Sequence, residues 1–223
     1  MSQAAVGTRT VERALTLLSA VAEGGGTLTE LARAAELSPS TASRLLATLA
    51  GQELVRRDEH GRYRAGTRLR RLAAASLRED PLYELAGPHL EALAEETGET
   101  ANLAVAADER QIVYLRQVAG HKLVQTAGWA GRTIPSRGTA LGSALRGALN
   151  ERGYVARAGA VEPEVTSIAA PVFGAGGEIA AALSVLAPTY RTPASRVDWC
   201  GRAVSRHAAE LSRSLGAPEA VAA

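Results

Sequence analysis

Hydrophobic and polar residues alternate with helical periodicity at the start of the chain. Apolar positions three and four residues apart predict a helix from about Thr10 to Ala22, which Gly24-Gly25-Gly26 would end. Its inner face is expected to consist of Val11, Ala14, Leu15, Leu18 and Val21. The first element of the fold is therefore predicted to be an amphipathic helix.

Two shorter helical patterns follow over residues 28–35 and 39–50, with a tight turn between them. Ser38 is suited to cap the second helix, and Pro39 fits its first position, where a missing N–H costs nothing. The inner face of the second helix is expected to be formed by Ala42, Leu45, Leu46 and Leu49. Its outer face carries short hydroxyl side chains and Arg44, residue types that contact phosphates and base edges of DNA.

A basic hairpin is predicted directly after this pair of helices. Residues 53–57 and 62–64 are strand-like and flank the loop Asp58-Glu59-His60-Gly61, and arginines concentrate positive charge there. Two helices and a basic hairpin in this order are typical of a winged helix-turn-helix, which lays its second helix in the major groove of DNA. The candidate DNA-contacting residues are Thr29, Ser38, Ser40, Thr41, Ser43, Arg44, Thr48, Arg62, Tyr63 and Arg64. The structural alternative is a plain helical hairpin with a solvated polar face, followed by a solvated edge pair.

The distribution of charge agrees with a DNA-binding amino-terminal part. Residues 1–78 contain 12 arginines against 7 acidic residues, a net charge of +5, whereas the rest of the chain has a net charge of −3. We therefore expect only the first third of the chain to contact nucleic acid.

The remainder of the chain is predicted to form a linker helix and an α+β domain. A basic helical pattern over residues 67–78 stops at Asp80-Pro81 and is interpreted as the linker. Further helices are predicted over residues 82–97 with an interruption at Gly87-Pro88, over residues 139–150, and from an N-cap at Thr192 to Gly216. Strands are predicted over residues 102–106, 111–118, 123–127, 166–172 and 178–186. Strands in pairs with helices beside them favour an α+β architecture.

Composition excludes several classes of protein. The chain has 223 residues, of which 46% are hydrophobic and only 4% aromatic, so its cores must be built from Ala, Leu and Val. Its single cysteine, Cys200, excludes an internal disulfide and fits a reducing cytoplasm. The sequence has no apolar signal segment and no membrane-spanning run, so a cytoplasmic protein without a membrane partner is predicted.

An enzyme is not expected. The sequence contains no phosphate-binding or dinucleotide-binding glycine motif and no nucleophile elbow. His60, His89, His121 and His207 are scattered, with no ligand spacing between any two of them. Neither a metal site nor a cofactor is therefore predicted.

Several segments together resemble one family of bacterial regulators. The amino-terminal half contains VERALTLLSAVAE, LTELARAAELSPSTASRLLATL and LVRRDEHGRYRAG, and the carboxy-terminal half contains LAEETGETANLAV, GRTIPSRGTALGSAL, TSIAAPV and AALSVLAP. In this order, over residues 10–215, they resemble the IclR family of transcriptional regulators. The resemblance implies a winged helix-turn-helix joined by a linker helix to a GAF-like α+β effector-binding domain. It also implies a homodimer, or a dimer of dimers, that binds palindromic double-stranded operator DNA and responds to a small organic acid.

The resemblance and the predicted elements together divide the chain. Residues 1–66 are expected to form the winged helix-turn-helix and residues 67–80 the linker helix. Residues 81–216 are expected to form the effector-binding and oligomerisation domain, and residues 217–223 a flexible tail.

The resemblance also places the effector site, and Trp129, just before the matching segment, is expected to wall it. The candidate residues are Trp129, Ile134, Arg137, Gly138, Thr139, Ala140, Arg157, Val165, Ser167, Ser184 and Leu186. The free N–H groups at the start of the helix expected at Thr139 would favour a carboxylate. Arg137 and Arg157 would add to this preference, with an effector bearing two acidic groups as one option.

The chain departs from the family pattern at several positions. Members often have a histidine where Arg137 stands, a lysine where Ser143 stands and an acidic residue where Arg157 stands. The stretch from Asn150 to Gly153 is also shorter than in the family and lacks an extra helix. The predicted function is a ligand-responsive regulator of a metabolic operon. The alternative is a DNA-binding protein whose second domain only oligomerises.

Overall fold

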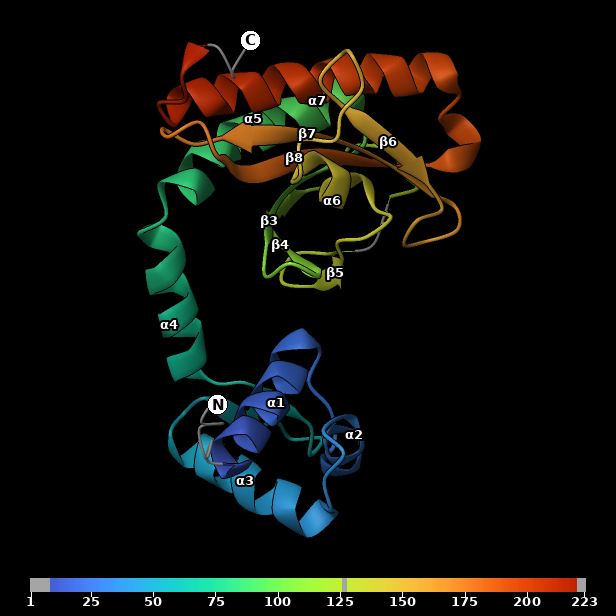
Figure 1. Ribbon diagram of the computed structural model, residues 1–223. Helices are drawn as coiled ribbons and strands as arrows, with labels where there is room; N and C mark the ends of the chain where they lie inside the picture. Colours follow the sequence, from blue (N-terminus) through green and yellow to red (C-terminus); the bar gives the residue numbers. More distant parts are fainter. Residues whose placement is uncertain (1–8, 126–127, 220–223) are drawn as a thin grey trace, which may run out of the picture. The chain divides into compact units, whose positions relative to one another are not determined.

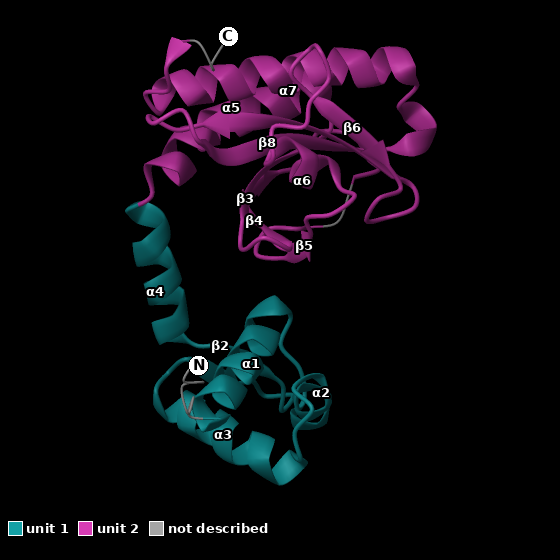
Figure 2. Cartoon of the chain, viewed as in Figure 1, with its two compact units in different colours: residues 1–79 teal, residues 80–223 magenta. Residues whose placement is uncertain are grey.

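Residues 9–125 and 128–219 are described by the computed structural model, and the chain divides into two units, residues 1–79 and 80–223 (Figure 2). The amino-terminal unit contains α1 (Arg9–Glu23), α2 (Leu28–Ala34), α3 (Pro39–Gly51), β1 (Val55–Arg57), β2 (Tyr63–Ala65) and α4 (Thr67–Arg78). These elements are the helices and the hairpin that the sequence predicts. The unit is a winged helix-turn-helix followed by one further helix.

The buried face of α1 differs from the predicted one. Leu17 and Val21 are buried, whereas Val11 and Leu15 are 52% and 56% exposed. The two buried residues share one core with Leu31 and other apolar residues of α2 and α3. Because the face of α1 with Leu17 and Val21 packs against α2 and α3, the apolar side chains of Val11 and Leu15 remain exposed.

Side-chain caps define where α2 and α3 begin. Thr27 Oγ1 accepts a hydrogen bond from the Glu30 N–H (3.3 Å), and the Glu30 carboxylate accepts one from the Thr27 N–H (2.8 Å). Ser38 Oγ accepts a hydrogen bond from the Thr41 N–H (3.3 Å), and Pro39 occupies the first turn of α3. The N-cap predicted at Ser38 is confirmed.

The hairpin is joined to the helices by backbone hydrogen bonds. Strands β1 and β2 are antiparallel, with Arg56 opposite Arg64. The Gly26 N–H donates to the Tyr63 carbonyl (3.1 Å), and the Tyr63 N–H donates to the Gly26 carbonyl (2.7 Å). The connection between α1 and α2 therefore extends the hairpin and fixes its base.

The carboxy-terminal unit is a curled, six-stranded antiparallel sheet with helices on both faces (Figure 1). Its elements are α5 (Pro81–Thr97), β3 (Thr100–Ala106), β4 (Gln111–Val118), β5 (Thr133–Pro135), α6 (Ala140–Ala144), β6 (Val155–Ala158), β7 (Val165–Phe173), β8 (Ile179–Pro188), the 3₁₀ helix η1 (Thr189–Arg191) and α7 (Ala194–Ser214). The strands lie in the order β5-β4-β3-β8-β7-β6. Helices α5 and α7 cover one face, and the short helix α6 lies on the other (Figure 1). The predicted α+β class is confirmed.

Side chains along the central strands β3 and β8 point alternately to the two faces of the sheet. Leu103 and Leu183 are opposite each other and belong to the core under α5 and α7. Their neighbours Asn102 and Ser184 are also opposite each other and, because side chains alternate along a strand, face the α6 side. The α6 face therefore contains buried polar groups as well as apolar ones.

Helix α5 is continuous, although the sequence predicts an interruption at Gly87-Pro88. Pro88 cannot donate to the Glu84 carbonyl, but Glu84 is exposed and water can satisfy it. Gly87 is buried, and a Cβ there would lie 2.6 Å from Nη1 of Arg116. The Arg116 guanidinium donates a hydrogen bond to the Tyr83 carbonyl (3.2 Å). The glycine thus makes room for a side chain that holds the start of the helix.

The helix predicted over residues 139–150 is shorter than expected. It is restricted to α6, and the backbone at Gly147 has a φ of 70°, which a right-handed helix cannot contain. The strand predicted over residues 123–127 is wrong for Leu123 to Gln125, which lie in a loop, while residues 126–127 lie outside the described residues. Strands β5 and β6 are not predicted, because runs of three and four residues give little periodic signal.

Helix α7 begins after Pro193 rather than at a Thr192 cap. The Thr192 hydroxyl instead donates to the Pro188 carbonyl (2.7 Å). Gly216, with a φ of 82°, follows the end of the helix as predicted. Of the predicted tail, residues 220–223 lie outside the described residues. None of the helices in the described parts of the chain is long and apolar enough to cross a membrane.

A buried carboxylate ties three segments of the carboxy-terminal unit together. Glu99 lies directly before β3 with its side chain 3% exposed, and it accepts hydrogen bonds from Lys122 Nζ (2.6 Å) and Arg191 Nη2 (2.7 Å). Burial alone would raise the pKa of Glu99, but the hydrogen bonds and charges of Arg191 and Lys122 outweigh it and hold the pKa below its usual value. Glu99 is therefore ionised and paired.

The substitution Glu99→Gln is expected to lower the free energy of unfolding of the carboxy-terminal unit by about 3 kcal/mol, because it leaves two cations without their buried partner. Urea denaturation at pH 7 measures this loss. The lowered pKa makes the contribution of Glu99 present above the ordinary carboxyl pKa of about 4.3 and lost as the pH falls below it. The difference between wild type and variant should accordingly shrink in acid.

The control is Glu95→Gln, which removes an exposed carboxylate 3.9 Å from His121. It should change the free energy of unfolding by no more than about 0.5 kcal/mol. Equal effects of the two substitutions would contradict the assignment of Glu99 as a buried tie.

Candidate DNA-binding surface and ligand cavity

Helix α3 presents its polar side chains on one face. Exposed on it are Ser38, Ser40, Ser43, Arg44 and Thr48, and Thr41 is half-buried. The Ser38 hydroxyl lies 2.9 Å from the Thr41 hydroxyl and 3.1 Å from the Ser40 hydroxyl. This face therefore combines a cluster of hydroxyl groups at the helix start with one exposed guanidinium, as the sequence predicts.

The wing is organised by Asp58. Its carboxylate accepts hydrogen bonds from the backbone N–H groups of His60 (3.1 Å) and Arg62 (2.9 Å) and from Arg64 Nε (3.3 Å). The Arg62 N–H, opposed by partial burial and assisted by Arg64, holds the pKa of Asp58 below its usual value. Arg64 Nη1 also donates to the Gly24 carbonyl (3.1 Å), so this side chain is bound within the unit.

The wing residues predicted to contact DNA are therefore not equivalent. Arg62 lies 3.4 Å from Glu30, and Tyr63 is half-buried against the core. Arg64 is held at the base of the wing, whereas Arg56 on β1 is exposed and takes part in none of these contacts. Thr29 is exposed in the first turn of α2.

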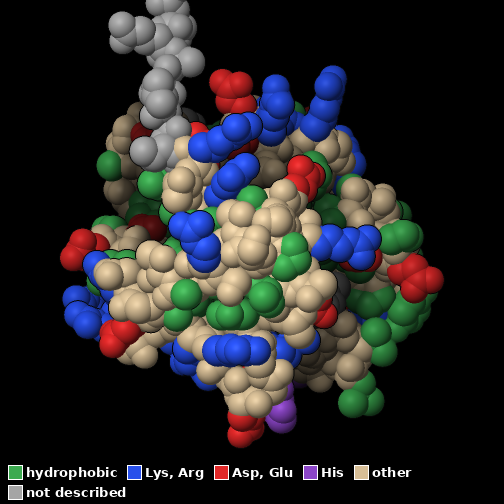
Figure 3. Space-filling view, turned by 90° about the horizontal axis from the view of Figure 1, so that it is seen from below, with side chains coloured by type: hydrophobic (Ala, Val, Ile, Leu, Met, Phe, Trp, Pro, Cys, Tyr) green, Lys and Arg blue, Asp and Glu red, His purple; other side chains and the backbone are tan. Residues whose placement is uncertain are grey.

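Positive charge is distributed over a broad surface. Figure 3 shows one face of the molecule, on which Lys and Arg side chains are spread among hydrophobic, acidic and other surface groups. Because residues 1–78 carry a net charge of +5, the amino-terminal unit attracts the phosphate backbone of nucleic acid whatever its sequence.

A cavity of about 30 Å³ lies on the α6 face of the sheet in the carboxy-terminal unit. It is lined by residues of β4, β5, β7 and β8, by the start of α6 and by the loop between β6 and β7. The lining residues are Tyr114, Trp129, Ile134, Thr139, Ala140, Leu141, Arg157, Ala160, Val161, Glu162, Val165, Ser167 and Leu186. Most of this surface is apolar, with Arg157 and Glu162 as its charged groups.

The cavity brings together most of the residues predicted for the effector site. These are Trp129, Ile134, Thr139, Ala140, Arg157, Val165, Ser167 and Leu186. Arg137 and Gly138 are exposed and do not line it, so the structure does not bring the two predicted arginines together. Ser184 is fully buried in β8, two residues from Leu186.

The start of α6 lacks the full set of free N–H groups and the strong dipole that a long helix would provide. With five residues, α6 has almost no helix dipole, and the Gly142 N–H is already bonded to the Thr139 hydroxyl (3.1 Å). The long helix expected at Thr139 is therefore absent, and a carboxylate bound there would lack the dipole of such a helix. Arg157 remains the positive group on the cavity.

Tyr114 and Trp129 form an aromatic wall of the cavity. Their ring centroids are 5.8 Å apart, and the Arg132 guanidinium lies 5.5 Å from the Trp129 ring. Tyr114 is 3% exposed, and burial raises the pKa of its phenol, so the hydroxyl stays protonated and can donate a hydrogen bond. That Tyr114 faces this side of the sheet can be predicted from its spacing of two residues from Ile112 on the same strand. Val161 and Glu162 lie in a loop, where no such pattern exists.

Unpartnered polar atoms are buried on the same face of the sheet. Thr100 Oγ1, Asn102 Oδ1 and Ser184 Oγ have no hydrogen-bond partner among the described residues. Buried polar groups nearly always have a partner, so these atoms require water or another polar molecule. They give the α6 face a capacity for polar binding that its apolar lining alone would not have.

Two family descriptions match this chain. Residues 10–59 match the IclR helix-turn-helix domain, and residues 74–152 and 147–213 match the bacterial transcriptional regulator IclR C-terminal domain. The chain belongs to the IclR family.

Relatives within the family agree with this assignment. The chain is 30% identical to the HTH-type transcriptional regulator BhcR of Paracoccus denitrificans over 92% of its own length and 87% of the relative. An IclR regulator of Alicyclobacillus acidocaldarius has the same fold, with a TM-score of 0.77, 24% identity, and coverage of 92% of this chain and 98% of that one. An IclR homologue of Microbacterium hydrocarbonoxydans, solved with 4-hydroxybenzoate, has a TM-score of 0.75, 23% identity and the same coverage. IclR-family regulators combine a DNA-binding domain with an effector-binding carboxy-terminal domain.

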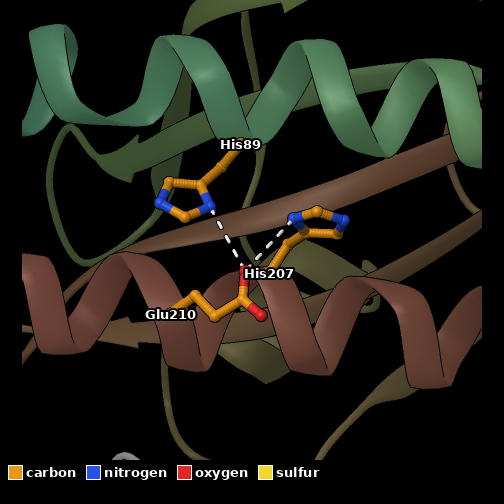
Figure 4. A group of neighbouring side chains, drawn as sticks. All are labelled: His89, His207 and Glu210. Atoms are coloured by element: carbon orange, nitrogen blue, oxygen red, sulfur yellow. Dashed lines mark ion pairs between the residues drawn. The ribbon is translucent and has the colours of Figure 1, made fainter.

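One group of side chains is not predicted from the sequence. His89 and His207 have no ligand spacing along the chain, yet in the structure they are neighbours, with ring centroids 5.9 Å apart, and Glu210 lies beside both (Figure 4). The two histidines come from α5 and α7, which are far apart in the sequence, so no spacing rule relates them. Burial and the neighbouring His207 lower the pKa of His89.

The substitution Gly142→Ala is expected to destabilise the carboxy-terminal unit by about 2 kcal/mol, because a Cβ there would lie 1.8 Å from the Ser136 carbonyl oxygen. In an unobstructed helix the same change stabilises by about 0.5–1 kcal/mol, so the sign is diagnostic. Thermal unfolding measures it. Gly128→Ala is the control, since the nearest neighbour of an added Cβ among the described residues is 3.7 Å away, and it should be close to neutral. If Gly142→Ala were stabilising, α6 would not pack closely against the backbone at Ser136.

Proposed function

We propose that this IclR-family chain is a homodimeric repressor or activator of a metabolic operon, controlled by a small organic acid that binds the cavity on the α6 face. The observation that carries the proposal is the cavity itself, with its aromatic wall, apolar lining and single arginine. It lies in the domain that the family uses for effectors.

The polarity of the cavity favours a compact acid with a planar apolar body. Tyr114 and Trp129 suit an aromatic or conjugated group, and Arg157 together with the protonated Tyr114 hydroxyl suits a carboxylate. The Microbacterium homologue was solved with 4-hydroxybenzoate, a compound of this class. Glu162 disfavours a second acidic group, so a monoanion is preferred over a dianion.

The size of the cavity implies that binding moves its walls. A volume of about 30 Å³ leaves room for only about one or two water molecules, far less than an organic acid occupies. Trp129 is half-buried and borders both this cavity and a wider groove of about 650 Å³. Displacement of its indole would join the two spaces and couple effector binding to a change in shape.

DNA recognition is assigned to the exposed face of α3. Arg44 and the hydroxyl groups of Ser40, Thr41, Ser43 and Thr48 would contact bases and phosphates, and the wing would contact the neighbouring backbone. A dimer would place two such helices in successive major grooves of a palindromic operator. The exposed apolar side chains of Val11 and Leu15, with Leu72 of α4 at 56% exposure, are suited to contact a second copy.

The substitution Arg44→Ala is expected to weaken binding to operator DNA by about 5- to 150-fold, the loss of a specific arginine contact. Mobility shifts with the DNA upstream of the protein's own gene measure this, at two salt concentrations. Arg33→Ala is the matched control, because it removes an exposed arginine from α2 and lowers the net charge equally. An unchanged affinity for Arg44→Ala combined with complete loss for Arg62→Ala would reverse the roles of helix and wing.

Effector binding can be followed through Trp129, because the chain has only one other tryptophan, Trp199. In a Trp199→Phe variant all indole emission comes from Trp129, and a panel of aromatic and aliphatic acids should contain compounds that shift this emission saturably. The corresponding carboxamides are the controls for charge. Arg157→Ala should weaken binding of an active acid by about tenfold and leave its amide unaffected.

The competing function is a DNA-binding protein whose carboxy-terminal unit only oligomerises. It predicts that no acid changes the Trp129 emission, the thermal stability or the mobility-shift pattern, while specific DNA binding persists. An acid that shifts the emission but not the DNA complex would separate binding from regulation.

A further inference from the structure

Helices α5 and α7, which cover the face of the sheet opposite α6, direct three side chains of metal-ligand type toward one point. His89 comes from α5, and His207 and Glu210 lie one turn apart on α7 (Figure 4). Their nearest ligand atoms are within 4.8 Å of one another. This cluster lies on the opposite face of the sheet from the α6 cavity, so it is independent of the proposed effector site.

The distances in the cluster are too long for hydrogen bonds but within reach of a shared ion. Nδ1 of His89 and Nδ1 of His207 each lie 3.8 Å from the same oxygen, Oε2 of Glu210. A tetrahedral zinc ion with bonds of ~2.0–2.1 Å holds its ligand atoms ~3.4 Å apart. Small rotations of the partly exposed Glu210 side chain and the His89 ring would bring the three atoms to that spacing.

The environment of His207 determines which of its nitrogens can accept. Nε2 lies 3.3 Å from the Glu96 carboxylate, which also accepts a hydrogen bond from Arg206. A carboxylate can only accept, so Nε2 carries the proton, and Nδ1 is the nitrogen that can offer a lone pair to a metal ion. That Nδ1 is buried and has no hydrogen-bond partner among the described residues. A lone pair directed at a carboxylate oxygen is repulsive unless a cation lies between them.

We propose that His89, His207 and Glu210 bind a divalent ion of the zinc class and clamp α5 to α7. Two imidazole nitrogens and one carboxylate oxygen are a known zinc ligand set, which leaves a fourth position for water. The partial exposure of Glu210, 38% for its side chain, keeps that position accessible. Glu96 orients His207 as the outer carboxylate that commonly accompanies a histidine ligand.

The main competitor is an ion pair without metal. In that arrangement His207 would be doubly protonated and its Nδ1–H would face Glu210. Such a protein would show no response to zinc. The zinc titration therefore separates the two arrangements.

The test uses the full chain, freed of metal with a chelator and then titrated with zinc(II) against an indicator of known affinity. We expect one zinc per chain, a higher unfolding temperature with zinc, and d–d absorption of a four-coordinate site when cobalt(II) replaces it. His89→Ala and Glu210→Gln should each weaken zinc binding by at least about tenfold, and Glu96→Gln by about tenfold through the orientation of His207.

Glu210→Gln keeps the size of a partly exposed side chain, so it tests the site even where a change at the buried His207 would disturb folding. His121→Ala is the matched control, because it removes a surface histidine that lies 3.9 Å from Glu95. The proposal is overturned if the wild type retains no zinc, or if His89→Ala and Glu210→Gln bind it as tightly as His121→Ala does.

Discussion

The carboxy-terminal unit depends on the antiparallel pairing of β3 with β8. These strands are distant in the sequence but adjacent at the centre of the sheet, and each carries two sets of side chains that face opposite ways. Leu103 and Leu183 commit one set to the core under α5 and α7, which leaves Asn102 and Ser184 on the α6 side. A shift of one residue would exchange the two sets and bury the polar groups beneath the helices. This register therefore fixes where the unit can bind small molecules.

The sheet also separates two binding chemistries within one small domain. Its α6 face carries the cavity with Tyr114, Trp129 and Arg157, which suits an organic anion. The opposite face is covered by α5 and α7, and the histidine and glutamate cluster on these helices suits a metal cation. Because the two groups lie on opposite faces of the sheet, a ligand at one of them makes no direct contact with a ligand at the other.

The sequence predicts features that depend on neighbouring residues, but not those that depend on contacts between distant segments. Ser38 and Pro39 define the start of α3 through capping chemistry alone, and the hairpin follows from its glycine turn. The continuity of α5 was missed because it depends on Arg116, which reaches Gly87 and Tyr83 from another element. Most of the residues that line the cavity are predicted through the family resemblance. Val161 and Glu162 are not, because they lie in a loop without a periodic pattern. The pairing of His89 with His207 arises only when α5 and α7 lie side by side.

The single lysine of the chain has a consequence for how DNA binding can be controlled. Lys122 is committed to Glu99 in the carboxy-terminal unit, so every basic side chain of residues 1–79 other than His60 is an arginine. A guanidinium keeps its charge throughout the physiological range of pH and is not a target of lysine acetyltransferases. The electrostatic attraction of this unit for DNA is therefore permanent, immune to the modification by which many regulators are tuned.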